Sequence, residues 1–462
     1  MMTGPNVRGE TWLVLGLARS GCAAGALLRR HGAVVIGYDD TPERDLRAAW
    51  AARDLAALAD AAFDEVRAGG AWGDLDARRL AGVVLSPGFP PDHPRLAGLR
   101  GRVEVRGELE WAARFCAARL IGITGTNGKT TTTELTAHLA RAAGWRAEAL
   151  GNVGRPLSLV ADTLGPNDVA VLELSSFQLE TIATFRPAVA VVLNLEPDHL
   201  DRYPDVAAYY RTKRRLVEAL PPDGWFVTWT GCREARGWRP GGPMLLFGAR
   251  AEGARVWADA GELGLDWDGA ARFLCAPSAL RLRGAPNLLN ACAAVAALLP
   301  LGADPAALAA ALPGFAGLPH RQRTVGRLGA VDFVDDSKAT NVAAVTAGLA
   351  GYVDAVVLIA GGRGKGEDYA PLRAALGPVR AVVTIGEEGP AIAATLAGLV
   401  PVTPAATFDE AVATAARLAA PRGTVLLSPA CASYDMFRDY VDRGERFAAA
   451  ARALGAVAGE AS

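Results

Sequence analysis

The stretch GITGTNGKTTTT, which runs from 122 to 133, constrains the fold of this chain more than any other segment. It follows the apolar run RLIGIT (119–124) and leads into TTTTELTAHLARAAG (130–144). This order predicts a strand, a glycine-rich turn and a helix. Because such a turn presents backbone N–H groups and a helix N-terminus to its ligand, the stretch favours the binding of an anion.

The turn is a variant of the phosphate-binding P-loop. The common P-loop carries a glycine five places before its Gly-Lys pair, and here Ile123 stands at that place. Lys129 would reach the β- and γ-phosphates of ATP, and the hydroxyl of Thr130 would hold Mg²⁺. We therefore expect an ATP cradle made of Gly125, Thr126, Asn127, Gly128, Lys129, Thr130 and Thr131.

Apolar segments that end in polar residues alternate with helix-length stretches along the chain, which predicts an α/β fold. Near the N-terminus, the turn Gly16-x-Ala18-x-x-Gly21 is one glycine short of the dinucleotide fingerprint, which is weak evidence for NAD, FAD or UDP. We expect three domains: a Rossmann-like domain at 1–107, a central P-loop ATPase-like sheet at 108–317 and a C-terminal Rossmann-like domain at 318–462.

The bulk composition is that of an ordinary soluble protein, with 51% hydrophobic and 21% charged residues among 462. A formal net charge of −1 gives no polyelectrolyte signal, so we expect no nucleic-acid partner. Six scattered cysteines without a C-x-x-C spacing favour a reducing compartment. Since neither an export signal nor an uninterrupted apolar span is visible, we expect a cytoplasmic protein without membrane insertion. We also expect a monomer.

Lysine is rare, because only four of the 48 basic residues are lysine. Each of the four stands in a short polar or glycine-containing segment, where arginine cannot replace a compact ammonium or a reactive amine. The four site candidates are Lys129, Lys213, Lys338 and Lys365. The segment YYRTKRRLVE around Lys213 also fits an exposed basic helix face, but a neutral amine there could react with CO₂ and give a carbamate that binds metal.

Two residues near strand ends are candidate metal ligands. Glu173 closes the predicted strand VLELSS, and a carboxylate there, in the same sheet as a P-loop, suits the magnesium shell. The alternative is a solvated strand end. His199 in NLEPDHLDRY would more often be structural, but beside a phosphate site it could ligate a second metal ion or hold a developing charge.

Three polar segments of the third region each follow a predicted strand: DDSKATN (335–341), GGRGKGED (361–368) and SPACASYDMF (428–437). Because the carboxyl ends of parallel strands share one edge of a sheet, their side chains could converge on an anionic small molecule. The candidates are Lys338, Thr340, Lys365 and Ser433. For Cys431 we favour a buried structural thiol over a nucleophile, since no adjacent base is evident.

Taken together, eight motifs resemble those of the Mur ligases: GTNGKTTT, ELSSFQLE, NLEPDHLDRY, TKRR, GLPHR, DDSKATN, AGGRGKG and LLSPACASYDMF. The resemblance spans most of the chain and is strongest to the members that add D-glutamate, because DDSKATN and SPACAS occur and no DNPR-type motif does. It implies ATP-dependent ligation of D-glutamate to UDP-N-acetylmuramoyl-L-alanine in peptidoglycan synthesis, through an acyl phosphate. ATP and two Mg²⁺ ions are the implied cofactors.

The resemblance also implies individual roles. Lys129, Glu173, His199 and Lys213 would be catalytic, and the metal ions would be held by Thr130, Glu173, His199 and carbamylated Lys213. The nucleotide would also contact Asn287, Asn290, His320, Arg321 and Asp336. D-Glutamate would contact Thr340, Lys365 and Ser433, with Tyr440 lining the pocket, and Lys338 remains a substrate-binding candidate from its place after a predicted strand. The UDP-sugar would contact Arg19, Ser20, Asp39, Asp40, Ser86, Gly88 and Asn152.

Three positions depart from the family pattern. Pro286 replaces a histidine, so the nucleotide contact there must depend on Asn287 and Asn290, while Thr212 and Tyr440 are smaller changes.

Three alternative functions remain: a folylpolyglutamate synthase, a NAD-dependent oxidoreductase and a non-catalytic P-loop switch. The N-terminal segment argues against the first, the imperfect fingerprint and the P-loop against the second, and the separate polar strand-end motifs against the third.

Overall fold

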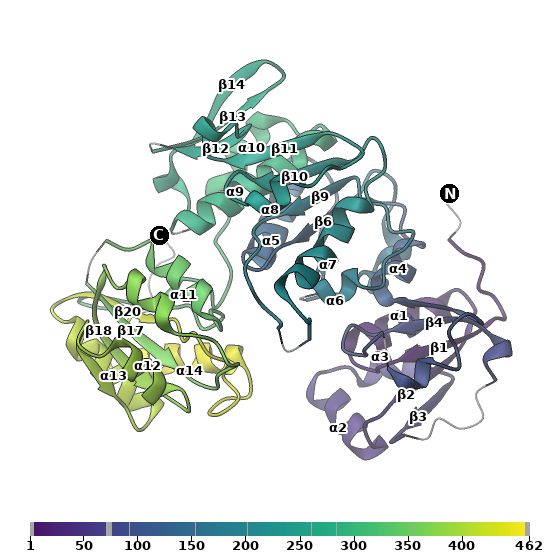
Figure 1. Cartoon of the computed structure of the whole chain (residues 1–462), viewed down its shortest axis with the longest axis horizontal. Helices are drawn as coiled ribbons and strands as arrows, with labels where there is room; N and C mark the ends of the chain where they lie inside the picture. Colours follow the sequence, from purple (N-terminus) through teal and green to yellow (C-terminus); the bar gives the residue numbers. More distant parts are fainter. Residues whose placement is uncertain are drawn as a thin grey trace. The chain divides into compact units, whose positions relative to one another are not determined.

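The computed structural model describes residues 4–70, 76–91, 93–152, 154–200, 202–259, 261–282, 284–353 and 355–457. They form an α/β protein with three separate β-sheets of five, nine and six strands (Figure 1). The predicted fold class is thereby confirmed. The chain divides into two compact units: residues 1–259, 264–274 and 291–311 form the first, and residues 260–263, 275–290 and 312–462 form the second. Among the described helices, none is long and apolar enough to cross a bilayer.

The first sheet is parallel, with the strand order β3-β2-β1-β4-β5. Its strands are β1 (Thr11–Leu15), β2 (Val34–Asp39), β3 (Glu65–Ala68), β4 (Leu80–Leu85) and β5 (Glu104–Gly107), and its helices are α1 (Arg19–Arg30), α2 (Glu43–Ala52), α3 (Ala56–Ala62) and α4 (Glu108–Ala113). Alternate residues of β1 enter opposite cores, Trp12 on one face and Leu13 on the other. Because the strand order reverses between β1 and β4, a ligand crevice is expected at their carboxyl ends.

The second sheet has the order β14-β13-β12-β11-β10-β9-β6-β8-β7. Its strands are β6 (Arg119–Thr124), β7 (Ala147–Gly151), β8 (Val169–Glu173), β9 (Val189–Val192), β10 (Trp225–Trp229), β11 (Met244–Gly248), β12 (Val256–Asp259), β13 (Glu262–Trp267) and β14 (Ala270–Cys275). Its helices are α5 (Lys129–Ala142), α6 (Ser176–Leu179), α7 (Val206–Glu218), α8 (Arg233–Arg236), α9 (Ala285–Leu298) and α10 (Pro305–Ala311). Because β6 pairs with β8 on one side and β9 on the other, the P-loop leaves the sheet at a switch point.

The third sheet has the order β15-β16-β20-β17-β18-β19, and only the β15–β16 pair is antiparallel. Its strands are β15 (Arg323–Leu328), β16 (Ala330–Asp335), β17 (Val356–Gly361), β18 (Val379–Ile385), β19 (Val402–Pro404) and β20 (Arg422–Leu427). Its helices are α11 (Val342–Leu349), α12 (Gly389–Leu396), α13 (Phe408–Ala419) and α14 (Tyr440–Ala453). The three polar segments singled out in the sequence follow β16, β17 and β20, which are neighbours in the sheet.

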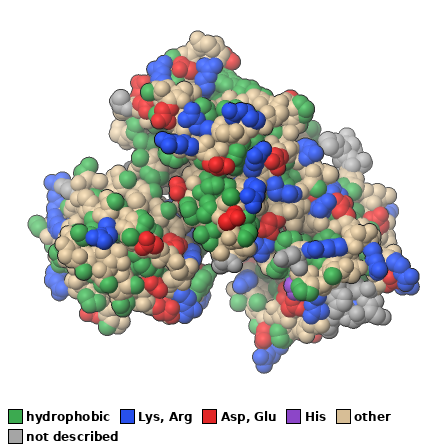
Figure 2. All heavy atoms as spheres, in the orientation of Figure 1, with side chains coloured by type: hydrophobic (Ala, Val, Ile, Leu, Met, Phe, Trp, Pro, Cys, Tyr) green, Lys and Arg blue, Asp and Glu red, His purple; other side chains and the backbone are tan. Residues whose placement is uncertain are grey.

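The structure also bears on the surface and the domain limits. Acidic and basic side chains are interspersed over the face drawn in Figure 2, as the balanced composition suggests.

Each sheet falls within one of the predicted domain ranges 1–107, 108–317 and 318–462. The boundaries between these ranges stay predictions.

Candidate active site

The P-loop connects β6 to α5 as predicted. Gly128 has φ 84° and is the N-terminal cap residue of α5, so the backbone turns through a left-handed conformation that glycine adopts without strain. At Gly125, with φ 152°, a Cβ atom would stand 3.0 Å from the Cβ of Leu193. The loop and the first turn of α5, which includes Thr130 and buried Thr131, therefore present N–H groups to one small volume.

The ammonium of Lys129 lies inside this cradle. Its Nζ donates to the carbonyl oxygens of Gly125 at 3.0 Å and Thr126 at 2.8 Å. Because the carbonyls of the loop hold this ammonium group, it lies close to the place that the phosphate oxygens of a bound nucleotide would occupy.

Asn194 fixes the conformation of the loop, although no sequence motif predicted this role. Its Oδ1 accepts from the N–H of Asn127 at 2.8 Å and of Thr126 at 3.2 Å, and its Nδ2 donates to the carbonyl of Asn127 at 3.0 Å. The Thr126 hydroxyl also donates to the carbonyl of Glu196 at 3.1 Å. The segment NLEPDH was noticed for its histidine, but its asparagine holds the loop in place.

Lys213 is buried against the same loop, with 1% of the residue exposed. Its Nζ donates to the Gly125 carbonyl at 2.9 Å and lies 3.4 Å from the hydroxyl of Thr124. Burial, reinforced by the nearby charge of Lys129, lowers the pKa of Lys213 well below its usual range. The exposed basic helix face considered as an alternative is therefore excluded for this side chain, and its amine favours the neutral, nucleophilic form.

Glu173 ends β8 and is buried, with 3% of the residue exposed. Its Oε1 accepts from Nδ2 of Asn152 at 3.3 Å, while its buried Oε2 has no hydrogen-bond partner among the described residues. An unsatisfied buried carboxylate oxygen fits a cation. In the described part of the chain no three His, Cys, Asp or Glu side chains gather as a metal cluster, but Mg²⁺ is commonly held by one or two carboxylates with phosphate oxygens and waters.

His199 occupies a strained position beside an aromatic group. It has φ 55°, and its exposed ring lies 5.0 Å from the ring of Phe177 and 5.9 Å from that of Tyr209. The Nζ of Lys213 lies 4.7 Å from the same Tyr209 ring. The structure thus brings His199 and Lys213 to one aromatic side chain, and a left-handed non-glycine residue often marks a functional turn.

A hollow of about 370 Å³ in the first unit contains most of the residues predicted to bind the UDP-sugar. It lies at the crevice expected beside β1 and β4, and it extends to the end of β7. Its lining includes the predicted Arg19, Ser20, Ser86, Gly88 and Asn152, together with Ala18, Arg53, Leu55, Pro87, Gly151, Gly154, Pro156 and Gln178.

Asp39 and Asp40, also predicted to lie around the UDP-sugar, do not line this hollow. The carboxylate of Asp39 accepts from the backbone N–H of Leu17 at 2.8 Å and of Thr41 at 3.0 Å. Asp40 accepts from the hydroxyl of Tyr38 at 2.5 Å and pairs with Arg95 at 3.2 Å. In this structure both carboxylates stabilise the end of β2.

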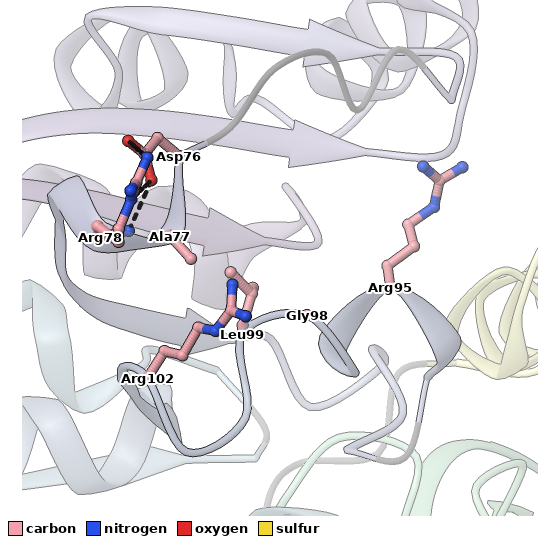
Figure 3. A pocket seen from close by; sticks show the side chains of 7 residues that line it. All are labelled: Asp76, Ala77, Arg78, Arg95, Gly98, Leu99 and Arg102. Atoms are coloured by element: carbon pink, nitrogen blue, oxygen red, sulfur yellow. Dashed lines mark hydrogen bonds and ion pairs between the residues drawn. The ribbon is translucent and has the colours of Figure 1, made fainter.

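A larger hollow of about 760 Å³ lies elsewhere in the first part of the chain and contains none of the predicted site residues (Figure 3). Arg78 on its wall pairs with Asp76 at 3.0 Å, and Arg95 points away from these residues. Since Arg95 pairs with Asp40 instead, these two arginines are already engaged by carboxylates. Size alone therefore does not identify the active site.

In the second unit the predicted amino-acid residues follow three adjacent strands. Lys338 follows β16, and its Nζ lies 3.8 Å from the centre of the Tyr440 ring. Ser433 follows β20 and is buried, whereas Thr340 is half-buried and Lys365, after β17, is exposed. Backbone hydrogen bonds join the three loops: Arg363 and Ala432 exchange two, each of 2.9 Å, and the N–H of Ala430 donates to the Ala339 carbonyl at 3.0 Å.

Arg443 of α14 is buried beneath these loops, although no sequence motif predicted a role for it. Its guanidinium donates to the carbonyls of Ser337 at 2.9 Å, Cys431 at 3.0 Å and Ala432 at 3.2 Å. Burial lowers its pKa to about 10, and no carboxylate within the described residues pairs with it. The side chain of Arg443 therefore joins the loop that carries Lys338 to the loop that carries Ser433.

The thiol of Cys431 is also buried, with its pKa raised to about 11 by burial, as expected for a structural cysteine.

The predicted nucleotide residues of the second unit form local polar contacts. The Nδ2 of Asn290 donates to Oδ1 of Asn287 at 3.1 Å. His320 Nδ1 lies 2.7 Å from the carboxylate of Asp335. Asp336 is buried, which raises its pKa to about 7, and it accepts from Ser428 at 2.9 Å. The charge of half-buried Arg321 acts on the same carboxylate and partly offsets the effect of burial.

Comparison with known proteins defines the class. A model of the Mur ligase middle domain matches residues 123–298, and a model of the Mur ligase glutamate ligase domain matches residues 320–431. The chain belongs to the Mur ligase family, whose members are ATP-dependent ligases. Relatives named UDP-N-acetylmuramoylalanine--D-glutamate ligase include one from Anaeromyxobacter dehalogenans, 43% identical over 96% of this chain and 98% of its own, and one from Geobacter metallireducens, 41% identical over 97% and 98%.

Solved structures support the fold. A MurF ligase from Thermotoga maritima in complex with ADP gives a TM-score of 0.60 at 16% identity, covering 91% of this chain and 96% of that one. A pseudomurein peptide ligase type C from Methanothermus fervidus gives 0.59 at 17% identity, with the same coverage. At such identities the likeness concerns the three-sheet fold.

Proposed function

We propose that this protein joins D-glutamate to UDP-N-acetylmuramoyl-L-alanine and converts ATP to ADP and phosphate in the same reaction, a step of peptidoglycan precursor synthesis. The observation that carries the proposal is the identity of about 40% over nearly the full length with ligases of that name. The proposal includes a monomer in the cytoplasm and the three domains 1–107, 108–317 and 318–462.

The chemistry follows from the two reacting groups. The carboxylate of the L-alanyl end attacks the γ-phosphorus of ATP, so that a carboxyl oxygen–phosphorus bond forms and ADP leaves. The amine of D-glutamate then attacks the activated carbonyl carbon, phosphate leaves and the nitrogen loses a proton. Positioning and charge stabilisation supply most of the catalysis in the phosphoryl transfer.

On this proposal the P-loop holds the ATP phosphates. Lys129 and the N-terminus of α5 orient the γ-phosphate, and Asn194 keeps the loop in its receiving conformation. Thr130 and Glu173 would hold Mg²⁺, which supplies charge neutralisation on the transferring phosphoryl group. The unsatisfied Oε2 of Glu173 supports this assignment.

Lys213 would act as a carbamate. Its neutral amine would form a nitrogen–carbon bond to CO₂ and release a proton, which gives an anionic group suited to a second Mg²⁺ with His199. Burial, the lowered pKa and the shared Tyr209 ring support this role. Arginine could not react in this way.

The second unit would supply the amino-acid subsite and part of the nucleotide subsite. Cationic Lys338 and Lys365 suit the carboxylates of D-glutamate, and the Thr340 and Ser433 hydroxyls suit their remaining oxygens. The Tyr440 ring lies beside Lys338 and would line the subsite. Asn287, Asn290, His320, Arg321 and Asp336 would contact the nucleotide.

A substrate panel tests the proposal. ATP-dependent phosphate release is measured with UDP-N-acetylmuramoyl-L-alanine and, in turn, D-glutamate, L-glutamate, L-alanine and meso-diaminopimelate. Release with D-glutamate alone among these amino acids supports the proposal, and release that needs neither substrate points to a P-loop switch.

A further inference from the structure

The pocket of about 370 Å³ in the first unit has a cationic wall, and the predicted Arg19 supplies only part of its charge. Among its lining side chains only those of Arg19 and Arg53 are charged. No aspartate or glutamate of the described chain lines the pocket, so the charge of its wall favours an anionic ligand.

The backbone position of Arg53 is fixed by hydrogen bonds at the end of helix α2. It follows α2 directly, and its N–H donates to the carbonyl of Trp50 at 3.3 Å. The buried Trp50 donates in turn from Nε1 to the carbonyl of Leu17 at 2.7 Å, in the turn between β1 and α1. The N–H of Leu55, which is also buried, donates to Trp50 at 2.8 Å. The backbone that carries Arg53 is therefore fixed to the turn that precedes Arg19.

The guanidinium of Arg53 has no hydrogen-bond or ion-pair partner among the described residues. By contrast, Nη1 of Arg19 donates to the carbonyl of Gly154 at 3.0 Å. The first turn of α1, which also borders the pocket, contains no acidic residue, and its cap residue Ala18 offers no side-chain acceptor. Helix N–H groups and two guanidinium groups thus border the same pocket.

We propose that Arg53, together with Arg19, binds the diphosphate of the nucleotide-sugar substrate; the inference rests on the proposed function. A guanidinium can donate two parallel hydrogen bonds to phosphate oxygens, which favours a diphosphate over an uncharged ligand. The family resemblance implies a role for Arg19 in this region, but not for Arg53.

A further lining residue connects the pocket to Glu173. Asn152 lines the pocket and donates to the carboxylate of Glu173 at 3.3 Å. A substrate held by its diphosphate near Arg53 can therefore extend along the pocket towards Glu173, where its carboxylate would meet ATP.

Binding measurements on the full chain test the role of Arg53. Titration calorimetry compares UDP with uridine, with ADP and Mg²⁺ present at saturation to occupy the P-loop. We expect Arg53→Met to weaken UDP binding by about 10- to 100-fold, the effect of losing a charge-assisted contact. Uridine binding and the melting temperature should stay unchanged, and Arg53→Lys should weaken UDP binding less.

Arg47→Met is the matched control. Arg47 lies on α2, is 60% exposed in its side chain, pairs with Glu43 at 2.7 Å and does not line the pocket. In steady-state assays Arg53→Met should raise the KM for the nucleotide-sugar while kcat and the KM values for ATP and D-glutamate stay unchanged. Arg47→Met should change none of these constants.

The possible failures can be distinguished. If the wild type binds UDP and Arg53→Met binds it equally well, the role of Arg53 is refuted and the proposed function stands. If the wild type binds neither UDP nor the nucleotide-sugar, the proposed function fails and the role of Arg53 fails with it.

Discussion

Lys129 and Lys213 donate to the same acceptor, the carbonyl oxygen of Gly125, at 3.0 Å and 2.9 Å. Two protonated amines that donate to one carbonyl in a buried site destabilise each other, because like charges repel strongly where water is excluded. The pKa of the more deeply buried Lys213 is accordingly lowered. Lys129 can therefore remain a cation that binds phosphate, while Lys213 is available as a neutral amine.

The first prediction concerns the carbamate. Lys213→Ala should lose at least about 100-fold in kcat, comparable to the loss of one preorganised catalytic contact. Short-chain carboxylic acids such as acetate should restore part of the activity, because they can return an anionic oxygen to the vacated space. Activity assayed with increasing acetate measures this, with Arg214→Ala as a control on the exposed face of the same helix. Full activity in Lys213→Ala would contradict the carbamate role.

The second prediction is that Lys213 lowers stability. A lysine whose pKa is lower in the folded chain binds its proton more readily when unfolded, so the folded state loses stability as pH falls below the unfolded pKa. Lys213→Met should therefore melt at a temperature equal to or above that of the wild type, and its advantage should grow from pH 9 to pH 6. Calorimetric melting curves in CO₂-free buffer, where the amine of Lys213 is not carbamylated, measure the difference across that range. A variant that becomes relatively less stable towards low pH would refute the assignment.

Asn194 is predicted to act through the shape of the P-loop. Asn194→Ala removes three hydrogen bonds to Thr126 and Asn127, and we expect kcat/KM for ATP to fall about 10- to 100-fold, the effect of a misplaced binding group. The KM for D-glutamate should change little. Exposed Asn167, in the turn before β8, provides the control Asn167→Ala. Equal ATP kinetics in both variants would show that the loop does not need Asn194.

Much of the site could be predicted because its signals are local in sequence. The P-loop occupies one strand–turn–helix unit, and polar segments after β16, β20 and β17 had to meet because parallel strands place their carboxyl ends at one edge. The burial of Lys213 was not predicted, and an exposed basic helix face was left open as an alternative. Its rarity among arginines singled it out, but burial depends on packing against β6.

The residues that were missed act over long sequence separations. Asn194 binds backbone atoms 67 residues earlier, and Arg443 binds the Ser337 carbonyl 106 residues earlier. Neither contact leaves a local pattern. Strand β15 was also missed, because its sequence RTVGRL has only one buried residue and gives no alternating apolar signal.

Arg443 is predicted to position the amino-acid subsite. Arg443→Met leaves the carbonyls of Ser337, Cys431 and Ala432 without this donor, and we expect a loss of about 2–4 kcal/mol in the free energy of unfolding. The KM for D-glutamate should rise about tenfold or more, and UDP binding in the first unit should be unaffected. Urea unfolding and steady-state kinetics measure these effects.

Arg446→Met, one turn further along α14, is the control for that experiment. Arg446 is 59% exposed in its side chain and pairs with Asp442 at 3.1 Å, so its replacement should change stability by less than about 0.5 kcal/mol. If Arg443→Met lowers stability but leaves the KM for D-glutamate unchanged, Arg443 has a purely structural role.

The central claim is that the γ-phosphate of ATP activates a carboxylate for attack by the amine of D-glutamate. The most direct measurement is phosphate release from ATP in the presence of UDP-N-acetylmuramoyl-L-alanine labelled with ¹⁸O in its free carboxylate. We predict that release requires D-glutamate and that one ¹⁸O atom appears in the phosphate. Release of unlabelled phosphate with D-glutamate present, or equal release without it, would show that the γ-phosphate does not activate this carboxylate for attack by D-glutamate.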